Sequence, residues 1–496
     1  MQSNYINTVL IYPKVGDEAY AVPHMPLSVL SVASAVQQKG YSVKIIDQRV
    51  EGDWKKAITD SISGSLLCFG ISSMTGPQIG HAIEIAKYIR EIASDIPIVW
   101  GGVHASILPE QTLQSYLVDI VVIKEGEEAF FEVLSALKNK SELKCIKGVG
   151  FKDSKGTIHI NRAGAFCDLN KYAFLDYSLL DIKEYQKQGQ ERVPRAASVS
   201  LYTSRGCPFK CTFCYNNSFH DSTWRGQSVD TVINSLSRLH NQGIKNIILC
   251  DEYFFQDIER ARSICQALTD REMQFRFFYA NCRLDQILKM KEEDIQLFHK
   301  SGFKDFFVGI ESGSLKMLKS ISKGITDTSN IEKAAAKLVR SGMSIQFSFM
   351  LGLPEESIED MKQTLKLMVE LLKKFPSCFV PGAGKFIPFP GTEAYNKTVE
   401  LGWHPPKYFE EWKEITKVNQ KEWLGDKVGT CAESALFLTS SFDTKINPRA
   451  NNLLEMIRKL YSKIARWKAK HGYIEFVPEY YIMKSHLGKI FKKKRK

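Results

Sequence analysis

The sequence predicts an α/β protein made of two successive sheet domains and a helix-rich C-terminal region. Short apolar segments of strand length alternate with helix-length segments whose apolar residues recur every three or four positions. This alternation occurs twice, with a looser polar stretch in between. We therefore expect a doubly wound (Rossmann-like) domain over residues 1–140, a connector over 141–195, a six-strand partial (β/α) barrel of the TIM type over 196–400, and a helical, basic region over 401–496.

The first domain carries five apolar segments that we expect to be strands. These segments are Thr8 to Tyr12, Ser42 to Asp47, Leu66 to Ser72, Ile96 to Trp100 and Ile120 to Ile123. Helices with one apolar face are expected between and after them, at Leu27 to Lys39, Trp54 to Ser61, Gly80 to Ile92 and Glu127 to Lys138. Such an order is typical of a parallel sheet covered by helices on both faces.

The connector contains a predicted hairpin, Val149 to Lys152 and Thr157 to Asn161, and then a polar stretch that ends near residue 195. The barrel strands are expected at Ser198 to Thr203, Asn246 to Cys250, Phe275 to Ala280, Asp305 to Ile310, Ser344 to Met350 and Lys385 to Pro388. Right-handed crossovers place the C-terminal ends of such strands on one rim, where barrels keep their chemistry.

Composition indicates a cytoplasmic protein of ordinary globular character. Of its 496 residues 44% are apolar, yet no run reaches the roughly 18 apolar residues of a membrane-spanning helix. The 11 cysteines are scattered, and no secretory signal is evident at the start. Much of the net charge of +12 lies in the final segment KSHLGKIFKKKRK. That tail is interpreted as a solvated terminus, against a docking arm for anionic lipid, an acidic carrier or a polyanion.

Three cysteines follow the first barrel strand in the segment SRGCPFKCTFCYN: Cys207, Cys211 and Cys214. A four-iron, four-sulfur cluster normally takes four Cys ligands, so three from one loop leave one iron free for another ligand. A structural zinc site wants four ligands in two close pairs, and neither His220 nor Cys250 has zinc spacing. Burial of three unpaired Cys is disfavoured by the polar residues of the loop.

The pattern CxxxCxxC followed by an aromatic residue, here Tyr215, resembles the radical S-adenosylmethionine superfamily. The resemblance implies a [4Fe-4S] cluster whose open iron binds S-adenosylmethionine, which is cleaved to a 5′-deoxyadenosyl radical. It also implies an electron donor such as a flavodoxin or ferredoxin. No catalytic residue beyond the three cluster ligands is assigned.

Later segments match the same family in order. ILCDEYFF ends the second barrel strand and FVGIESGS ends the fourth, while FMLGLPEES and FIPFPGT supply Gly and Pro turns at the rim. An acidic helix start capped by Asp257 is the alternative reading of the first of these segments. By resemblance, the residues expected to contact S-adenosylmethionine are Tyr215, Asp251, Glu252, Asn281, Arg283 and Glu311.

The first domain lacks both G-x-G-x-x-G and GxxxxGK[ST], so neither a dinucleotide nor a triphosphate site is supported. GGVH and EGEE instead follow two of its strands, and with Pro26-Leu27-Ser28 and Ser72-Ser73 they resemble the cobalamin (B12)-binding domain of one radical S-adenosylmethionine subclass. The resemblance implies a cobalamin site at Ser72, Ser73, Gly101, Gly102, His104, Gly126 and Glu127. Because Asp-x-His-x-x-Gly is absent, His104 is read as a pocket or turn residue rather than a cobalt ligand.

The leading hypothesis is a class B methyltransferase-like enzyme that methylates an unactivated carbon. Its rival is cobalamin-associated radical cyclisation or rearrangement without methyl transfer. A non-catalytic iron–sulfur or corrinoid sensor is a remote third reading, and it needs a nucleic-acid-binding module that the sequence does not show. Nucleic acid is accordingly not an expected partner.

The substrate class stays open between a small molecule, a lipid and a peptide. The basic C-terminus leaves room for peripheral membrane contact. Several aromatic residues beyond residue 400 either form a lid over a ring-bearing or hydrophobic substrate or pack in the core: Trp403, Tyr408, Phe409, Trp412 and Trp423.

Overall fold

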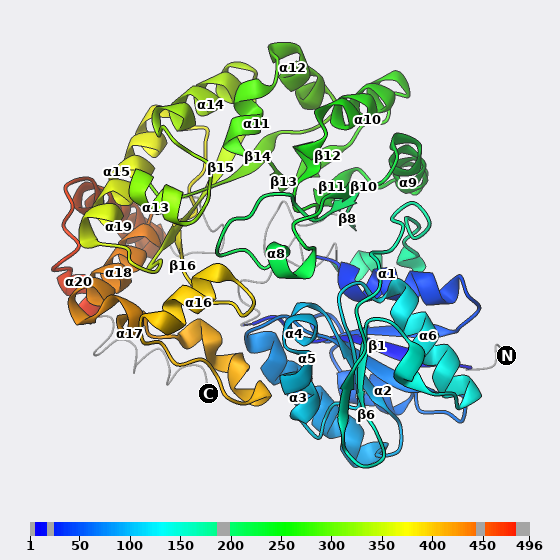
Figure 1. Cartoon of the computed structure of the whole chain (residues 1–496). Helices are drawn as coiled ribbons and strands as arrows, with labels where there is room; N and C mark the ends of the chain where they lie inside the picture. Colours follow the sequence, from blue (N-terminus) through cyan, green and yellow to red (C-terminus); the bar gives the residue numbers. More distant parts are fainter. Residues whose placement is uncertain (1–4, 17–23, 186–198, 443–451, 483–496) are drawn as a thin grey trace.

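The computed structural model describes residues 5–16, 24–185, 199–442 and 452–482. The polar stretch 186–195 and the basic tail 484–496 therefore lie outside the described residues. Figure 1 shows the N-terminal sheet domain, in blue and cyan, below the green and yellow barrel, with the orange C-terminal region alongside both. Within the described ranges, no helix is long and apolar enough to cross a membrane.

The N-terminal sheet has seven strands in the order β2-β1-β3-β4-β5-β6-β7. They are β1 (Thr8–Tyr12), β2 (Val43–Asp47), β3 (Cys68–Ser72), β4 (Ile98–Gly101), β5 (Ile120–Val122), β6 (Val149–Lys152) and β7 (Ile158–Ile160). The first five are parallel, whereas β6 and β7 pair antiparallel. The hairpin assigned to the connector thus extends this sheet, because β6 bonds to the free edge of β5.

Helices cover both faces of this sheet. One face carries α1 (Leu27–Gln37) and α6 (Gly126–Asn139), and the other carries α2 (Trp54–Thr59), α3 (Pro77–Ile92), α4 (Val103–Ile107) and α5 (Pro109–Gln114). Alternate residues of β1 show why two layers are needed: Leu10 packs in the core under α1 and α6, while Val9 and Ile11 pack in the core under α3. The predicted doubly wound domain is confirmed.

The second sheet system is a partial barrel of parallel strands. Its strands are β8 (Val199–Leu201), β11 (Asn246–Leu249), β12 (Arg276–Phe278), β13 (Ala280–Asn281), β14 (Asp305–Glu311), β15 (Ser344–Leu351) and β16 (Ala383–Lys385). Tyr279, with φ +58°, separates β12 from β13, so the third expected strand is divided between a three-stranded and a four-stranded sheet. The last strand is Ala383–Lys385, so it shares only Lys385 with the predicted strand Lys385 to Pro388. Pro388 has no N–H to donate to a neighbouring strand and lies outside it.

Helices separate successive barrel strands, as the alternation predicts. They are α9 (Val229–Asn241), α10 (Ile258–Asp270), α11 (Leu284–Lys289), α12 (Glu292–Lys300), α13 (Leu315–Ser320), α14 (Ser329–Arg340) and α15 (Ile358–Lys374). Local sequence sets their starts: Ser228, Asp257 and Ser357 each accept a hydrogen bond from a first-turn N–H. A two-stranded ribbon, β9 (Ser204–Arg205) with β10 (Arg225–Gly226), encloses α8 (Asn216–Phe219) near the cysteine loop.

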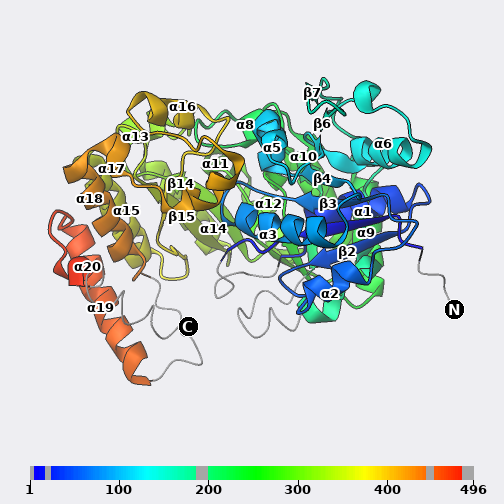
Figure 2. The same cartoon turned by 90° about the horizontal axis from the view of Figure 1, so that it is seen from below.

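The C-terminal region joins the two domains and then packs along the barrel. It comprises α16 (Glu393–Glu400), η5 (Phe409–Lys417), α17 (Lys421–Leu424), α18 (Asp426–Thr439), α19 (Asn452–Lys470) and α20 (Pro478–Ile482). The 3-10 helix η5 contacts α3 of the first domain, whereas α18 and α19 pack against α15 of the barrel. Figure 2 shows α19 at the end of the molecule away from the N-terminal domain.

The aromatic residues beyond residue 400 are mostly core. Trp403, Phe409, Trp412 and Trp423 are buried together with the face of the first sheet that packs under α3, whereas Tyr408 is exposed. The Trp412 indole Nε1 donates to Gln111 Oε1 at 2.6 Å. These residues therefore connect the domains, as the core reading predicts.

We predict that Trp412→Ala lowers the free energy of unfolding by about 3–5 kcal/mol, because it removes a buried indole from the joint between the domains. Tyr408→Ala, four positions earlier and exposed, is the matched control and should change stability by less than about 0.5 kcal/mol. Chemical denaturation followed by circular dichroism measures both. Equal effects of the two substitutions would contradict the buried placement of Trp412.

Candidate functional site

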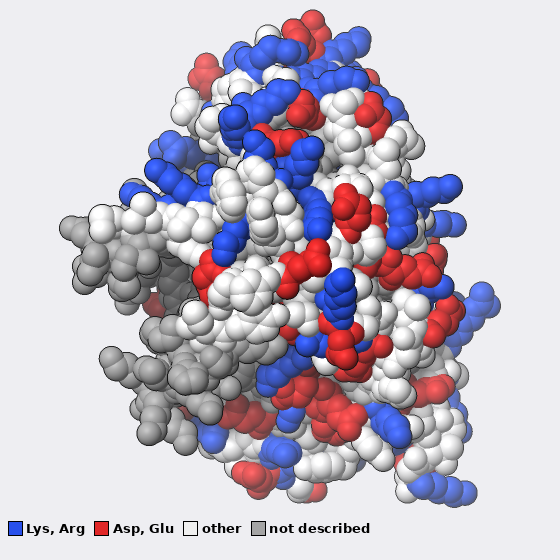
Figure 3. Space-filling view, turned by 90° about the vertical axis from the view of Figure 1, so that its left-hand side faces the viewer, with Lys and Arg blue, Asp and Glu red and all other residues white. Residues whose placement is uncertain are grey.

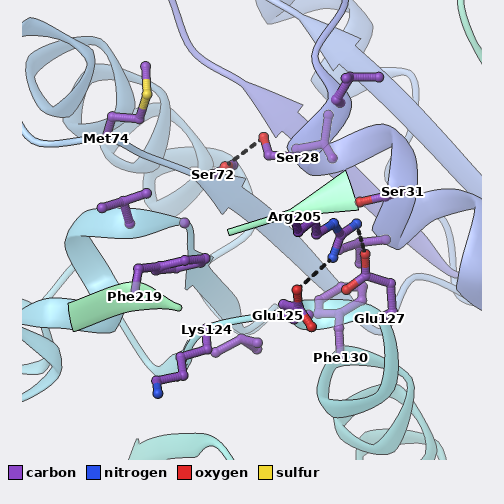
Figure 4. A pocket seen from close by; sticks show the side chains of 18 of the residues that line it. Ser28, Ser31, Ser72, Met74, Lys124, Glu125, Glu127, Phe130, Arg205 and Phe219 are labelled. Atoms are coloured by element: carbon purple, nitrogen blue, oxygen red, sulfur yellow. Dashed lines mark hydrogen bonds and ion pairs between the residues drawn. The ribbon is translucent and has the colours of Figure 1, made fainter. Parts of the chain in front are cut away.

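A cavity of about 410 Å³ lies between the carboxyl edge of the first sheet and the end of the barrel that carries the cysteine loop. On the sheet side it lies outside β1 and β3, where the strand order reverses, which is where open α/β sheets bind ligands. Its lining includes Tyr12, Ser28, Ser72, Gly101, Gly102, Lys124, Gly126 and Glu127 from the first domain and Tyr202, Arg205, Tyr215, Phe219, His220 and Glu252 from the barrel. Figure 4 shows the two sets facing each other.

Two adjacent glycines shape the sheet side of the cavity in different ways. At Gly102 (φ +90°) a Cβ would lie 2.6 Å from the Ser73 carbonyl oxygen, so the turn after β4 requires glycine. At Gly101 a Cβ would meet only the Val122 carbonyl oxygen, at 4.0 Å. The fold therefore tolerates a side chain at Gly101, but that side chain would occupy the cavity. This open cradle fits a large, flat ligand held against the strand ends.

The expected cobalamin residues divide into two groups. Ser72, Gly101, Gly102, Gly126 and Glu127 line the cavity, and the Ser72 hydroxyl lies 3.1 Å from that of Ser28. Ser73 and His104 are fully buried and are not among the lining residues. The position of Gly102 explains the burial of His104, because the chain turns there into α4 and carries the next side chains away from the cavity.

His104 packs beneath the cavity against the C-terminal aromatic residues. Its ring centroid lies 5.5 Å from those of both Phe409 and Trp412, and its Nδ1 is 2.9 Å from the Thr75 hydroxyl. Burial lowers the pKa of His104 to about 3, so the ring is neutral. Its position is that of a core histidine outside the cavity lining, and its buried Nε2 has no hydrogen-bond partner among the described residues.

A buried ion-pair cluster crosses from one domain to the other at the edge of the cavity. The Arg205 guanidinium, directly before the cysteine loop, lies 2.6 Å from Glu127 and 3.2 Å from Glu125 of the first domain. Arg225 on β10 adds a second contact to Glu125, at 2.5 Å. We name these four residues the interdomain charge cluster.

Electrostatics within the interdomain charge cluster keep Glu125 ionised. Burial alone would raise the pKa of Glu125, but Arg205 and Arg225 outweigh burial and hold that pKa at about 2. The Cys167 backbone N–H also donates to Glu125, at 2.9 Å. Sequence reasoning missed the pairing of Glu125 with Arg205 and Arg225. The available signal was an acidic EGEE loop in one domain and an arginine beside the Cys triad in the next.

The cysteine loop follows β9 and is held by short-range hydrogen bonds. The Asn216 and Asn217 side chains donate to the carbonyls of Cys207 and Cys211, at 2.7 and 3.0 Å. Gly206 has φ +84°, and a Cβ there would lie 2.0 Å from the Thr223 carbonyl oxygen, so only glycine permits this turn. The loop is thus fixed on both sides of the triad.

Cations surround the loop that carries Cys207, Cys211 and Cys214. The Arg283 guanidinium covers the Phe209 ring at 3.5 Å, and the Lys323 ammonium lies 5.9 Å from the centre of the Phe213 ring. Burial raises the pKa of Cys207, while the Phe209 N–H and the positive charges of Arg283 and Lys323 act in the opposite direction. Three cysteines with two cations nearby suit an anionic iron–sulfur cluster.

Among the described residues, no three His, Cys, Asp or Glu side chains are grouped so as to hold a single metal ion. A four-iron cluster requires a different arrangement of ligands, because each cysteine ligates its own iron and the thiols surround the cluster. The loop fits this arrangement, because it carries three cysteines on a turn that contains Gly and Pro.

Asp251 and Glu252, expected together at the rim, have different surroundings. Asp251 is buried, and its carboxylate accepts hydrogen bonds from the Thr203 N–H and hydroxyl at 2.7 Å and from the Ser204 hydroxyl at 2.5 Å. It therefore ties β11 to the start of the cysteine loop. Glu252 instead lines the cavity and accepts from the Gly206 N–H at 3.0 Å. Tyr215 lines the cavity beside it.

The remaining rim candidates lie near the loop and already have protein partners. Asn281 donates to the Asp251 carbonyl at 2.7 Å, and Arg283 donates to the Lys323 carbonyl at 3.0 Å. Glu311 is nearly buried, lies 2.9 Å from the Lys323 ammonium and has a left-handed φ of +73°. A non-glycine residue held in this conformation at the end of β14 carries backbone strain of the kind found at functional sites.

Two protein-family models match the chain, and each covers one domain. The model of the B12 binding domain matches residues 14–134, and that of the Radical SAM superfamily matches residues 201–368. The chain is 29% identical to an uncharacterized methyltransferase of Pyrococcus horikoshii, over 75% of this chain and 78% of that protein. It is 24% identical to an anaerobic magnesium-protoporphyrin IX monomethyl ester cyclase of a Synechocystis strain, over 66% of this chain and 64% of that protein.

A solved structure shares the fold over nearly the whole chain. The radical S-adenosylmethionine methyltransferase TsrM from Kitasatospora setae, with cobalamin and a [4Fe-4S] cluster bound, superposes with a TM-score of 0.69. The match covers 93% of this chain and 99% of that one, at 16% sequence identity. The order of a B12-type domain, a partial barrel and a C-terminal region is therefore common to both.

We predict that Arg205→Gln lowers the free energy of unfolding by about 3–5 kcal/mol, because Glu125 and Glu127 are then buried with a partner missing. The control is Lys56→Gln, which removes an ion pair to Asp60 in which both side chains are more than half exposed and should cost less than about 1 kcal/mol. Chemical denaturation measures both. A small effect of Arg205→Gln would show that the interdomain charge cluster does not hold the domains together.

Gly101→Val should leave the denaturation midpoint nearly unchanged and reduce corrinoid retention about tenfold or more, because the new side chain fills the cavity. Gly102→Ala is the matched contrast and should destabilise the fold through its contact with Ser73. Retention is read from corrinoid absorbance after gel filtration. If the Gly101→Val variant retained corrinoid as well as the wild type does, the cavity would not be the corrinoid site.

Proposed function

Because the chain belongs to the radical S-adenosylmethionine enzymes that carry a B12-binding domain, we propose that it methylates an unactivated carbon of its substrate. Its cofactors are a [4Fe-4S] cluster, S-adenosylmethionine and cobalamin. One observation carries the proposal: a single cavity is lined both by the carboxyl edge of the B12-type sheet and by residues next to the cysteine loop.

In this proposal Cys207, Cys211 and Cys214 hold the cluster, and the strand ends at Ser72 and Gly101 hold the corrinoid. When bound, the cluster with S-adenosylmethionine supplies hydrogen-atom abstraction, and cobalamin supplies the methyl group. Tyr215 and Glu252, which line the cavity beside the triad, are the proposed contacts to S-adenosylmethionine.

The protein's own contribution is to exclude water and to fix positions. Much of the cavity wall is apolar, with Leu10, Ile71, Val99, Val122 and Phe130 on the sheet side and Phe219 on the barrel side. Such a wall protects a reactive substrate carbon from solvent. Glu252 accepts the Gly206 N–H at 3.0 Å and so keeps the start of the cysteine loop in register with the cavity.

Arg283 and Lys323 are positioned to offset the negative charge of three thiolates. Each lies over an aromatic ring of the loop, and each has a second protein contact that limits its movement, Arg283 to Asp285 at 2.9 Å and Lys323 to Glu311 at 2.9 Å. We propose that a flavodoxin- or ferredoxin-type donor delivers the electron that the cluster needs.

Radical cyclisation or rearrangement without methyl transfer is the second candidate function. The similarity to a protein named as a magnesium-protoporphyrin IX monomethyl ester cyclase favours it, since that relative also matches over about two thirds of this chain. Both candidates use the same cavity, so the change in product composition separates them.

The test reconstitutes the enzyme anaerobically with iron, sulfide and hydroxocobalamin, supplies dithionite as the reductant, and adds S-adenosylmethionine carrying a deuterated methyl group together with extract of the source cells. We expect 5′-deoxyadenosine and a product that carries the labelled methyl group. A product that has lost two hydrogens, or an unlabelled isomer, would support cyclisation or rearrangement instead. Failure to take up corrinoid would contradict methyl transfer and leave the radical chemistry standing.

Replacing Cys207, Cys211 or Cys214 with Ala should abolish cluster absorbance and 5′-deoxyadenosine formation, because each thiol is a proposed iron ligand. Cys145→Ala is the control, since Cys145 is an exposed cysteine outside the loop, and it should change neither. Omitting the corrinoid should stop methylation but leave the formation of 5′-deoxyadenosine unchanged. Retention of the cluster by any triad variant would remove that cysteine from the ligand set.

A further inference from the structure

Helix α19 presents a row of large apolar side chains to solvent. Met456, Leu460, Ile464 and Trp467 are each about half exposed, with Leu460 at 54% and Trp467 at 55%. Their spacing of four, four and three residues places them along one side of the helix. Such a row is costly to leave in water and is unusual on a solvent-facing helix.

The row is not the face by which α19 packs on the protein. Ser462, Ala465 and Ala469 are buried, and the helix contacts α15 and α18. Arg466 donates to the Phe442 carbonyl and further fixes the rotation of the helix. The packed side is therefore already occupied, and the apolar row points outward as a second, separate apolar face.

The apolar surface continues beyond the end of α19. Trp467 stacks on Tyr473, with ring centroids 5.3 Å apart, and Phe476 stacks on Tyr481, with centroids 6.4 Å apart. The exposed large apolar side chains of this surface are Met456, Leu460, Ile464, Trp467, Tyr473, Phe476, Tyr481 and Ile482. We name this surface the α19 face. Other exposed apolar side chains among the described residues are spread over many elements.

Lysines are interleaved with this apolar row. Lys459, Lys463 and Lys470 are exposed on the same helix, next to Leu460, Ile464 and Trp467. The sequence between residues 484 and 496 contains seven Lys and Arg and no Asp or Glu. Figure 3 views the molecule from the side of α15 to α20 and shows many basic side chains there, with acidic ones between them.

This combination favours a lipid surface over a protein partner. Buried centres of protein interfaces are depleted in lysine, whereas lysines flanking Trp and Leu are typical of helices that lie in a bilayer interface. Lysine can place its ammonium among anionic headgroups while its methylene chain lies along the apolar layer. Each basic residue near an anionic leaflet adds attraction that salt weakens.

We propose that the α19 face docks on a membrane surface containing anionic phospholipid, with the apolar row inserted at the level of the headgroups. Docking here means contact along the bilayer surface, and none of the helices in the described ranges can cross a membrane. In Figures 1 and 2 α19 lies at the opposite end from the N-terminal domain, so docking leaves that domain facing away from the lipid. The inference stands apart from the proposed reaction, because it concerns a surface that does not line the cavity.

The test is co-sedimentation of the full-length protein with vesicles of phosphatidylcholine alone or mixed with phosphatidylglycerol. We expect binding to the mixed vesicles and little to phosphatidylcholine, with weakening at high salt. The variant Leu460→Ser/Ile464→Ser/Trp467→Ser should reduce binding about tenfold or more. Lys459→Gln/Lys463→Gln/Lys470→Gln should reduce it in proportion to the anionic lipid content.

Tyr116→Ser/Val399→Ser is the matched control, because it removes two exposed apolar side chains from other elements and should bind vesicles like the wild type. Equal denaturation midpoints and unchanged 5′-deoxyadenosine formation show that the variants are folded. Absence of binding to anionic vesicles would overturn the proposal. The proposal would also be overturned if the wild type were a dimer that bound no vesicles and the apolar triple variant were a monomer. The α19 face would then join two copies of the chain.

Discussion

The relative orientation of the two domains depends on the interdomain charge cluster of Glu125, Glu127, Arg205 and Arg225. Charges taken out of water are tolerated only when each has a close, correctly oriented partner, so this contact accepts little sliding or rotation. Glu125 and Glu127 lie at the start of α6, shortly after β5, and Arg205 immediately precedes Gly206 and the cysteine loop. One buried contact therefore places the strand ends of the first sheet opposite the triad.

Other contacts reinforce the same alignment from different sides. Lys124 pairs with Asp221 across the domains at 2.5 Å, and the aromatic core around Trp412 joins the first sheet to the region after the barrel. Within the barrel, the Asp251 carboxylate bonds Thr203 and Ser204 and so fixes β9 relative to β11. The cavity consequently lies between domains that several packed contacts hold together.

The distribution of apolar surface in the C-terminal region follows from this architecture. The apolar side chains of its first part are buried between the domains, where Phe409 and Trp412 cover His104 and the helices of the first domain. Its last part packs only one side of α19 against α15 and α18, through small residues such as Ala465 and Ala469. Met456, Leu460, Ile464 and Trp467 of α19 remain outside, and they give the molecule a surface whose character differs from the rest.

The sequence by itself determined the element order, the doubly wound domain, the six-strand partial barrel and the position of the triad, because these follow from local periodicity and from spacing within one loop. It also placed Ser72, Gly101 and Gly102 at strand ends, where a parallel sheet gathers its ligand residues. Only the tertiary structure decided which of two neighbouring acidic residues lines the cavity. Asp251 and Glu252 are neighbours in sequence, yet one is enclosed by Thr203 and Ser204 while the other lines the cavity. The pairing of Glu125 with Arg205 and the outward face of α19 were likewise decided by packing, since both depend on segments distant in the chain that no local pattern relates.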